Sequence, residues 1–347
     1  LINLERLIDD RCLAPWDLDT APRFPEDRVD YGAVINFKQR MLRLAYDNYK
    51  RNASETLRTG LAEFVAANRW WLDDYTLFAA LKEAHGGASW STWEQDIATH
   101  QPTALEHWRD VLSDQVHYHE YVQFTFDRQW TALKAYANEQ GISIMGDVPI
   151  YVAYDSADAW AHPGLFHFDA QGAPTLVAGV PPDYFSPTGQ RWGNPIYNWE
   201  AMAQEGYAWW IDRFRRAFAQ VDVVRLDHFR GFDASWAVPA EEETAINGQW
   251  LKSPGRELLQ AVAAALGPAR FVAEDLGLIT PEVEALREEC GFPGMKVLQF
   301  AFSDDPDNPY LPHNYEANAV VYTGTHDNDT TAGWWNTAGE LERAAFR

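Results

Sequence analysis

Hydrophobic side chains recur at the helical period through the first part of the chain. Between residues 31 and 50, and again between residues 103 and 140, apolar positions follow one another at intervals of three or four. Residues 52–85 continue this spacing until two consecutive glycines, Gly86 and Gly87, interrupt it. The pattern predicts a mostly helical region over residues 1–140.

After Gly141 the pattern changes to short apolar runs that alternate with helical stretches. A polar or glycine-rich loop follows each run, and the runs cover residues 142–148, 221–227, 271–274, 296–300 and 319–323. Alternating strands and helices predict a parallel sheet with crossover helices, either doubly wound or closed into a barrel. No glycine-rich phosphate-binding turn follows any run, which disfavours the nucleotide-binding, doubly wound form.

The predicted strands end in acidic residues. Four acids lie at or just after the carboxyl ends of the runs, namely Asp147, Asp227, Glu274 and Asp327. In a β/α barrel the carboxyl ends of the strands surround the active site. One acid in such a place is usually a helix cap or a surface residue, whereas four acids in equivalent places indicate a functional site.

The second of these strands ends in a cluster of charges that is costly to bury, formed by Arg225, Asp227, His228 and Arg230. Arg225 and Asp227 are two residues apart, so both side chains lie on one face of the strand. We expect the arginine to lower the pKa of Asp227 and to keep it ionised. An ionised carboxylate beside a cation is suited to act as a nucleophile.

Glu274 has different surroundings, because it directly follows the apolar residues 271–273. An apolar setting and nearby negative charge raise the pKa of a carboxyl group, so we expect Glu274 to be the protonated partner. One ionised and one protonated carboxyl suit glycosidic bond chemistry. The first attacks the anomeric carbon and the second protonates the leaving oxygen.

Aromatic residues are unusually frequent, with 16 Trp, 15 Tyr and 18 Phe making up 14% of the chain. Residues 179–199 concentrate them among four prolines and three glycines, and the rings are those of Tyr184, Phe185, Trp192, Tyr197 and Trp199. A large core would explain the composition, but a surface loop rarely contains so many rings. We interpret the segment as a loop that covers a substrate and stacks on sugar rings.

The formal net charge is −23, from 28 basic and 51 acidic residues. So acidic a surface repels phosphate backbones and anionic lipids, which disfavours nucleic-acid and membrane partners. The chain has two cysteines, Cys12 and Cys290, and no apolar run as long as a membrane-spanning helix. We therefore expect a cytoplasmic protein.

Five motifs then occur in a fixed order along the chain. They are GDVPIYV at 146–152, PPDYFSPTGQRWGNPIY at 181–197, VRLDHFRGF at 224–232, AEDLG at 273–277 and THDND at 325–329. Together they closely resemble the amylomaltase family, the 4-α-glucanotransferases or disproportionating enzymes of the α-amylase superfamily. The resemblance covers nearly the whole chain and is strongest from Gly146 to Trp335.

The resemblance assigns roles to individual residues. It implies that Asp227 is the nucleophile that becomes glucosylated, Glu274 the general acid/base and Asp327 the stabiliser of the transition state. The substrate-binding residues that it implies are Arg225, His326, Asp147, Asp183, Trp192, His228 and Gln190. The family uses no cofactor and no metal, and it transfers α-1,4-glucan segments with retention of configuration through two displacements.

The resemblance also implies an α/β fold of the (β/α)8 TIM-barrel type with helical insertions. The five runs after residue 141 correspond to strands 3 to 7 of that barrel, so we expect a chain that is truncated at both ends. Residues 1–140 are then the helical insertion subdomain or subdomains. Residues 141–347 are the catalytic barrel portion, with the aromatic substrate loop at 179–199.

Two other functions remain open. An α-1,4-glucan hydrolase would use the same carboxylates and pass the glucosyl unit to water. A carbohydrate-binding protein would use the acids only to bind hydroxyl groups, which the pairing of Arg225 with Asp227, and Glu274 on the next strand, disfavours. We expect maltooligosaccharide donors and acceptors as partners and a monomer, with the oligomeric state left open.

Overall fold

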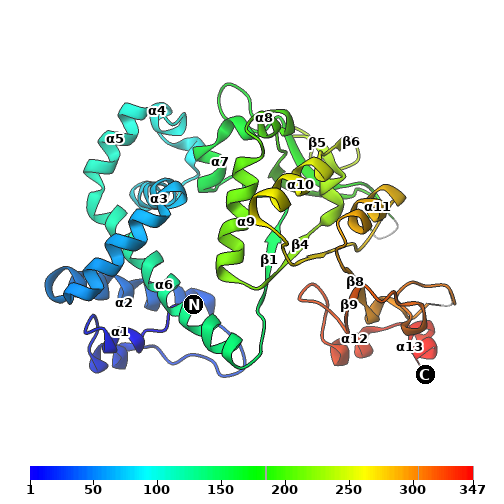
Figure 1. Cartoon of the computed structure of the whole chain (residues 1–347), viewed down its shortest axis with the longest axis horizontal. Coiled ribbons are helices and arrows are strands. Elements are labelled where there is room, and N and C mark those ends of the chain that lie inside the picture. The colour runs from blue at the N-terminus through cyan, green and yellow to red at the C-terminus, as the bar shows by residue number, and fades with distance from the viewer. Residues whose placement is uncertain (184–185, 304, 347) are drawn as a thin grey trace. The chain divides into compact units, whose positions relative to one another are not determined.

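The computed structural model describes residues 1–183, 186–303 and 305–346, which fall into two compact units (Figure 1). The first unit consists of Leu1–Gln140, Tyr154–Pro163 and Ala170–Ala173, and the second of Gly141–Ala153, Gly164–Asp169 and Pro174–Arg347. Within the described residues, the first unit contains only helices and turns, whereas the strands belong to the second unit.

Three long helices dominate the helical unit: α2 (Tyr31–Asn52), α3 (Glu55–Ala84) and α6 (Ser113–Glu139). Asp30 and Ser54 cap the first two, because each side chain accepts a hydrogen bond from an amide that the first helical turn leaves unpaired. The shorter helices of this unit are α1 (Arg6–Asp9), α4 (Gln95–Ala98), α5 (Pro102–Val111) and α7 (Ala157–Ala161).

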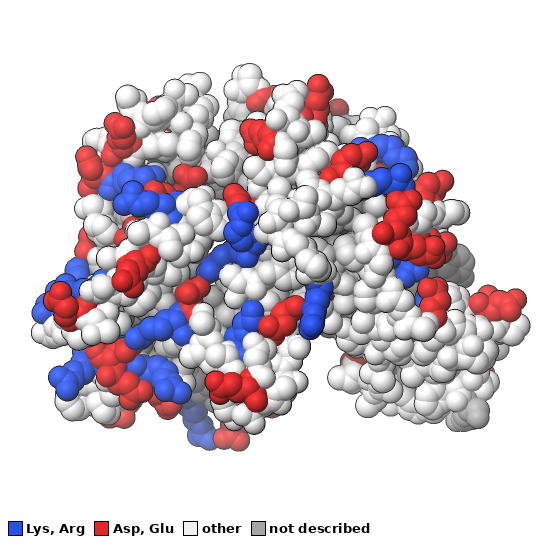
Figure 2. Space-filling view, in the orientation of Figure 1, with Lys and Arg blue, Asp and Glu red and all other residues white. Residues whose placement is uncertain are grey.

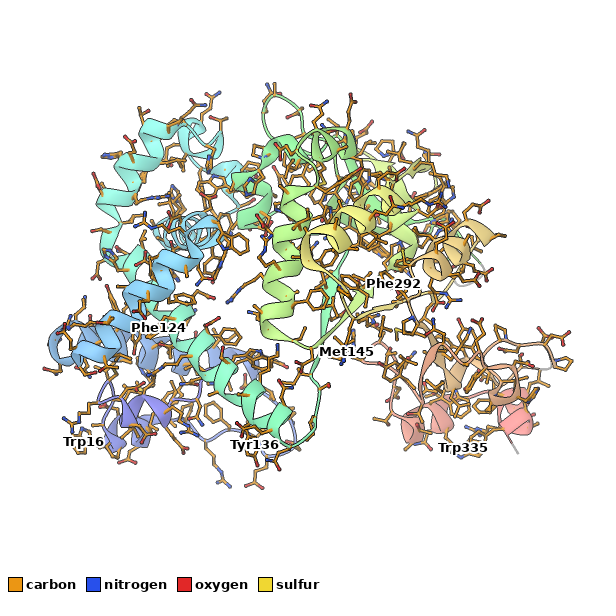
Figure 3. The ribbon with its side chains drawn as sticks, viewed as in Figure 1. Trp16, Phe124, Tyr136, Met145, Phe292 and Trp335 are labelled. Carbon is orange, nitrogen blue, oxygen red and sulfur yellow. The ribbon has the colours of Figure 1, made fainter. Side chains whose placement is uncertain are left out.

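The long helices meet in an aromatic core. The rings of Tyr46 and Tyr49 on α2 lie 5.7 and 5.0 Å from the ring of Tyr121 on α6. Phe124, one helical turn further on, lies 5.8 Å from Phe64 of α3 (Figure 3). Aromatic pairs at these separations add to the stability that comes from burying their apolar area. The helices therefore form a body with its own hydrophobic core.

Residues 154–163 join the helical unit through Trp160 of α7, although the sequence analysis placed them in the barrel portion. The Trp160 ring is fully buried and lies 5.8 Å from Phe78 and 6.0 Å from Trp93. Its Nε1 donates a hydrogen bond to the Ile97 carbonyl at 2.9 Å. A local pattern of apolar residues does not reveal which core a ring enters, and here the tertiary contact decides it.

Parallel strands form the frame of the second unit. In the described residues they are β1 (Met145–Pro149), β4 (Val223–Asp227), β7 (Phe271–Ala273), β8 (Gly294–Val297) and β9 (Ala319–Tyr322). The first three are neighbours in the order β1-β4-β7, and β8 pairs with β9. The Ala273 amide donates to the Pro293 carbonyl at 2.9 Å and so connects the two groups. Each of the five predicted runs overlaps one of these strands, but residues 298–300 of the fourth run form a 3₁₀ helix instead of continuing β8.

Helices alternate with these strands and cover them. They are α8 (Trp199–Gln204), α9 (Ala208–Gln220), α10 (Gly255–Leu266), α11 (Pro281–Glu289), α12 (Thr331–Thr337) and α13 (Glu340–Phe346). Phe214 of α9 is fully buried, and its ring lies 5.0 Å from Phe271 of β7. Phe292 packs on the same ring at 5.2 Å (Figure 3). This apolar layer fixes the positions of β4 and β7.

A second sheet, of four antiparallel strands, is absent from the sequence-based prediction. It contains β2 (Leu176–Val180), β3 (Gln190–Pro195), β5 (Ala234–Pro239) and β6 (Gln249–Lys252), in the order β3-β2-β5-β6. The segment expected to be a loop at 179–199 therefore contains a strand hairpin. Glycine is unfavourable in strands, so the glycines of this segment predict a loop. Gly179 is nevertheless required for the pairing, because a Cβ there would lie 2.3 Å from the Gln190 carbonyl oxygen.

The strand register brings the predicted acids to one edge of the parallel sheet. Asp147 of β1 lies opposite Arg225 of β4, and Leu226 of β4 lies opposite Ala273 of β7. Glu274 directly follows β7, and its amide donates to the Leu226 carbonyl at 3.0 Å. Because parallel strands end at the same edge, side chains from three strands meet there.

Gly255, the first residue of α10, lies so close to the loop after β4 that a Cβ there would be 2.2 Å from the Phe232 carbonyl oxygen. We expect Gly255→Ala to lower the free energy of unfolding by about 1–3 kcal/mol, because backbone atoms must move apart. Gly164→Ala is the matched control, since a Cβ there meets no atom within 4 Å. Urea unfolding followed by tryptophan fluorescence measures both, and equal stabilities would contradict this packing.

Candidate active site

Arg225 joins the carboxyl ends of β1 and β4. Its Nη1 donates hydrogen bonds to both oxygens of Asp147, at 2.8 Å each, and to Oδ1 of Asp227 at 2.9 Å. The arginine is only 7% exposed. A buried guanidinium needs partners that offset its lost hydration, and the two carboxylates provide them. Three of the predicted site residues therefore form one ion-pair cluster.

Burial is the largest influence on the Asp227 carboxyl, and it raises the pKa above its ordinary value. The Arg225 guanidinium opposes this shift, whereas the negative charges of Asp147 and Asp327 add to it. The expectation that Arg225 leaves Asp227 with a lowered pKa is therefore wrong. The physical reason is that one buried cation serves two carboxylates, so desolvation outweighs the attraction that remains for Asp227.

Glu274 has a pKa raised to about 7, chiefly because the side chain is buried. The charges of Asp227 and Asp275 add to this shift, while Arg225 and a hydrogen bond from the His228 amide oppose it. That amide donates to Oε2 at 2.7 Å. The direction agrees with the expectation from the apolar residues before it. A carboxyl with this pKa exchanges its proton near neutral pH, as a general acid/base requires.

His326 and Asp327 lie in the loop after β9 and are exposed. Their side chains are 66% and 69% exposed, and His326 Nε2 lies 3.4 Å from Asp327 Oδ2. The Asp327 amide donates to Thr325 Oγ1 at 3.2 Å, which shapes the turn. Asp327 is close enough for its charge to raise the pKa of Asp227. The loop therefore faces the same site as the strand-end acids.

The β2–β3 hairpin contributes an aromatic wall beside the cluster. Trp192 is 39% exposed, and its ring meets that of His228 edge-on at 4.8 Å. Its Nε1 donates to Gln190 Oε1 at 3.1 Å. Burial and the Arg230 charge lower the pKa of His228 to about 4, so the imidazole is neutral at physiological pH. Gln190, Trp192 and His228 thus form a single group of contacts.

Asp183 is held by a local turn of the hairpin. Its Oδ1 accepts a hydrogen bond from the Ser186 amide at 2.7 Å, and its own amide donates to the Ser186 carbonyl at 3.0 Å. The side chain is exposed. Tyr184 and Phe185, which the sequence analysis counted among the rings of the substrate segment, lie outside the described residues.

Tyr151 is a site residue that the sequence reasoning missed. It is 6% exposed, and its ring lies 6.3 Å from Trp192 and 6.4 Å from His228. Burial raises its pKa to about 12, with the nearby Ser235 side chain opposing the shift, so the phenol stays protonated. The residue belongs to the GDVPIYV motif, and a signal for it was present there: an aromatic residue four positions after a strand-end acid, just beyond the end of β1.

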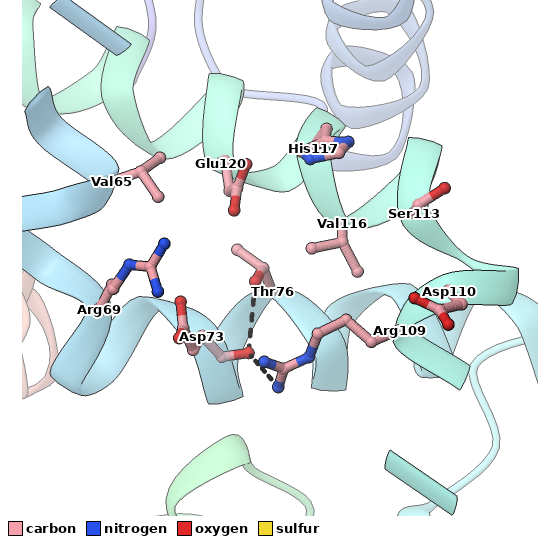
Figure 4. Close-up of a pocket in the computed structure, with 10 residues that line it drawn as sticks. All are labelled: Val65, Arg69, Asp73, Thr76, Arg109, Asp110, Ser113, Val116, His117 and Glu120. Carbon is pink, nitrogen blue, oxygen red and sulfur yellow. Dashed lines mark hydrogen bonds between the residues drawn. The ribbon is translucent and has the colours of Figure 1, made fainter. Parts of the chain in front are cut away.

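The helical unit has a pocket of its own, with a volume of about 300 Å³, between α3, α5 and α6 (Figure 4). The charged or titratable side chains in its lining are those of Arg69, Asp73, Arg109, Asp110, His117 and Glu120. Burial raises the pKa of Glu120. No Trp, Tyr or Phe is among the described residues that line this pocket, so it lacks a stacking surface for a sugar ring.

Three further findings concern surface charge, metal ligands and membrane-spanning helices. Figure 2 shows acidic and basic side chains interspersed on the face in view, without one continuous basic patch. Among the residues that the structure describes, no group of three His, Cys, Asp or Glu side chains is arranged to hold a metal ion. Nor is any described helix long and apolar enough to cross a membrane.

Comparisons with known protein families agree over the whole length of the chain. The profile of glycoside hydrolase family 77, described as 4-alpha-glucanotransferase, matches residues 1–347. A 4-alpha-glucanotransferase of Synechocystis is 53% identical over 98% of this chain, and one of Thermus thermophilus is 52% identical over 93%. The chain spans 68% and 65% of those two relatives, or about two thirds of their length.

Solved structures give the same fold. An amylomaltase from Streptococcus agalactiae, described in complex with acarbose, matches 99% of this chain and 70% of its own, with a TM-score of 0.94 and 36% identity. An amylomaltase from Corynebacterium glutamicum has a TM-score of 0.71 over 86% of this chain and 40% of its own, at 24% identity, and supports the fold alone. The predicted TIM-barrel type of α/β fold is confirmed by the first match.

The raised pKa of Glu274 makes stability depend on pH. Between pH 4.5, the ordinary pKa, and pH 7, the folded state binds this proton more tightly than the unfolded state. Glu274 therefore lowers stability as pH rises through this window. We expect the free energy of unfolding of Glu274→Gln to rise relative to that of the wild type across the window, by an amount on the order of 1–3 kcal/mol.

Urea unfolding at intervals from pH 4 to 8 measures this difference. The exposed Glu288 on α11 provides the matched control. Glu288→Gln removes a carboxylate from the same unit but leaves the strand-end cluster unchanged. A difference between Glu274→Gln and wild type that stays constant over the whole range would contradict the raised pKa.

Proposed function

The chain belongs to glycoside hydrolase family 77, the 4-alpha-glucanotransferases, and on that premise we propose that the protein transfers α-1,4-glucan segments between maltooligosaccharide chains by a retaining double displacement. The observation that carries the proposal is the pair of carboxyl groups at the strand ends. Asp227 is hydrogen-bonded to a buried cation, and Glu274, with a pKa of about 7, lies beside it.

Asp227 is the nucleophile in this mechanism. One of its oxygens forms a bond to the anomeric carbon of the donor while the bond to the glycosidic oxygen breaks, leaving a glucosyl ester. The Arg225 hydrogen bond at 2.9 Å orients the carboxylate and favours its ionised form. Asp147 supports this role indirectly, because it binds the same guanidinium and holds it in place.

Glu274 moves the proton in both steps. In the first it gives its proton to the leaving glycosidic oxygen. In the second it takes the proton of an acceptor hydroxyl, whose oxygen then replaces Asp227 on the anomeric carbon. A pKa of about 7 suits both directions, because neither protonation state is strongly disfavoured at neutral pH. Two inversions restore the α configuration.

The remaining residues bind the sugars. Asp327 and His326 on the loop after β9 contact the hydroxyls of the reacting ring, and the Asp327 charge favours an oxocarbenium-like transition state. Trp192 offers an exposed ring for stacking, with Gln190 and His228 beside it. Asp183, on the hairpin turn, takes part in the acceptor groove. Each of these roles is an assignment that mutagenesis can test.

Transfer, rather than hydrolysis, is the outcome we propose for the glucosyl ester. The aromatic wall of Tyr151, Trp192 and His228 is uncharged at neutral pH and limits water beside the cluster. An acceptor sugar covers the same wall and so competes with water. The curated relatives at 53% and 52% identity are both named transferases, which favours this reading over a hydrolase. A monomeric state and a cytoplasmic location stay predictions.

Incubation with maltotriose alone tests the function. We expect glucose together with a ladder of longer maltooligosaccharides when the products are resolved by size. The assay uses the full-length protein that contains these residues. Asp227→Asn should lower kcat by about a thousandfold or more, because it removes the nucleophile but keeps the shape of the side chain. Asp27→Asn, at an exposed side chain of the helical unit, is the matched control and should leave the rate unchanged.

The pattern of products separates the competing functions. Glucose and maltose without any product longer than maltotriose would replace transfer by hydrolysis. Saccharide binding with full retention of affinity in Asp227→Asn, and no turnover in either protein, would support the carbohydrate-binding reading instead.

A further inference from the structure

The chain makes a left-handed turn where β4 ends. His228 has φ of +50° and ψ of +55°, a conformation that a non-glycine residue adopts at a cost of roughly 1–2 kcal/mol. Such a conformation persists only where the surrounding structure holds it. This one directly follows Asp227 and begins the short 3₁₀ helix Phe229–Phe232.

The turn aims two successive amides at one residue. The His228 amide donates to Glu274 Oε2 at 2.7 Å, and the Phe229 amide donates to the Glu274 carbonyl at 3.1 Å. In an extended strand, successive amides point in opposite directions. A left-handed residue between them makes them converge, as in the backbone nests that bind anions. Both the carboxylate and the main chain of Glu274 are thereby held.

Neighbouring groups fix the turn from both sides. The His228 ring lies edge-on to Trp192 at 4.8 Å, and the Gly231 amide donates to the His228 carbonyl at 2.9 Å. A Cβ on Gly231 would lie 2.6 Å from Ile150 Cδ1, so the loop packs tightly against the segment after β1. The left-handed conformation is therefore stabilised by tertiary packing, although it is locally unfavourable.

We propose that His228 is a positioning residue for Glu274 and acts through its main-chain amide, which the left-handed turn directs at the Glu274 carboxylate. This role is separate from any contact that the imidazole makes with substrate, and it rests on the proposed function of Glu274 as the acid/base. The amide favours the ionised carboxylate, so it opposes the burial that favours the protonated form. The turn thereby sets both the place and the proton affinity of Glu274.

Four substitutions separate the backbone role from the ring role. His228→Asn and His228→Gly lose the imidazole but tolerate the left-handed conformation, whereas His228→Ala and His228→Val lose the imidazole and disfavour it. A contact between ring and substrate would raise KM in all four. The backbone role predicts that kcat is highest in H228G and H228N, lower in H228A and lowest in H228V, with H228V about 10- to 100-fold below H228G.

The pH profile gives a readout that a merely structural role would not move. Loss of a hydrogen bond to an ionised carboxylate raises its pKa, so the basic limb of kcat/KM should move up by about one pH unit in H228V and by less in H228A. In H228G and H228N the basic limb should stay where the wild type has it. The other groups that face Glu274, namely Arg225, Asp227, Asp275 and Tyr310, are unchanged in all four proteins.

Circular dichroism and thermal unfolding establish that each variant is folded. If H228V does not fold, the comparison of H228G with H228A is the test, and a carbon-13 titration of the Glu274 carboxyl measures its pKa directly. Equal losses of kcat in all four variants, with unmoved basic limbs, would overturn the positioning role. Failure of the proposed function is a different result, because Glu274→Gln would then keep the rate of the wild type.

Discussion

The active-site end of the barrel unit depends on one buried guanidinium. Arg225 binds Asp147 of β1 and Asp227 of its own strand through a single nitrogen, so the ion pair also connects two strands at their carboxyl ends. The loss of either acid would leave a buried charge without adequate compensation. The position of Asp227, the proposed nucleophile, and the electrostatics of Glu274 both depend on this cluster, since the Arg225 charge opposes the effect of burial at each.

Burial acts on the groups around the cluster in one consistent way: it favours their neutral forms. It raises the pKa of Glu274 to about 7 and that of Tyr151 to about 12, and it lowers the pKa of His228 to about 4. The side chains of Tyr151 and His228 are therefore uncharged near neutral pH, beside the ion pairs that Arg225 forms with its two acids. Such a wall is suited to the apolar faces of sugars and to the exclusion of water.

The antiparallel sheet brings distant parts of the sequence to this wall. Trp192 and Gln190 come from β3, and the close approach of β2 and β3 at Gly179 determines where that hairpin lies. The turn at His228 then serves both sides of the site, because its ring meets Trp192 while its amide meets Glu274. We therefore expect a change in the hairpin to alter the position of Glu274, the proposed acid/base, through the His228 turn.

The sequence by itself determined the alternation of strands and helices after residue 141, the acids at the strand ends and the motifs that identify the family. These features are local, since each depends on a run of neighbouring residues. Only the tertiary structure decided the formation of the antiparallel sheet, because the glycines and prolines of its strands are typical of a loop. It also decided that Trp160 packs in the helical core. It also decided the raised pKa of Asp227, the place of Tyr151 and the left-handed turn at His228. The reason is that burial, the sharing of one cation between two acids and the packing that stabilises a strained turn all depend on residues far apart in the chain.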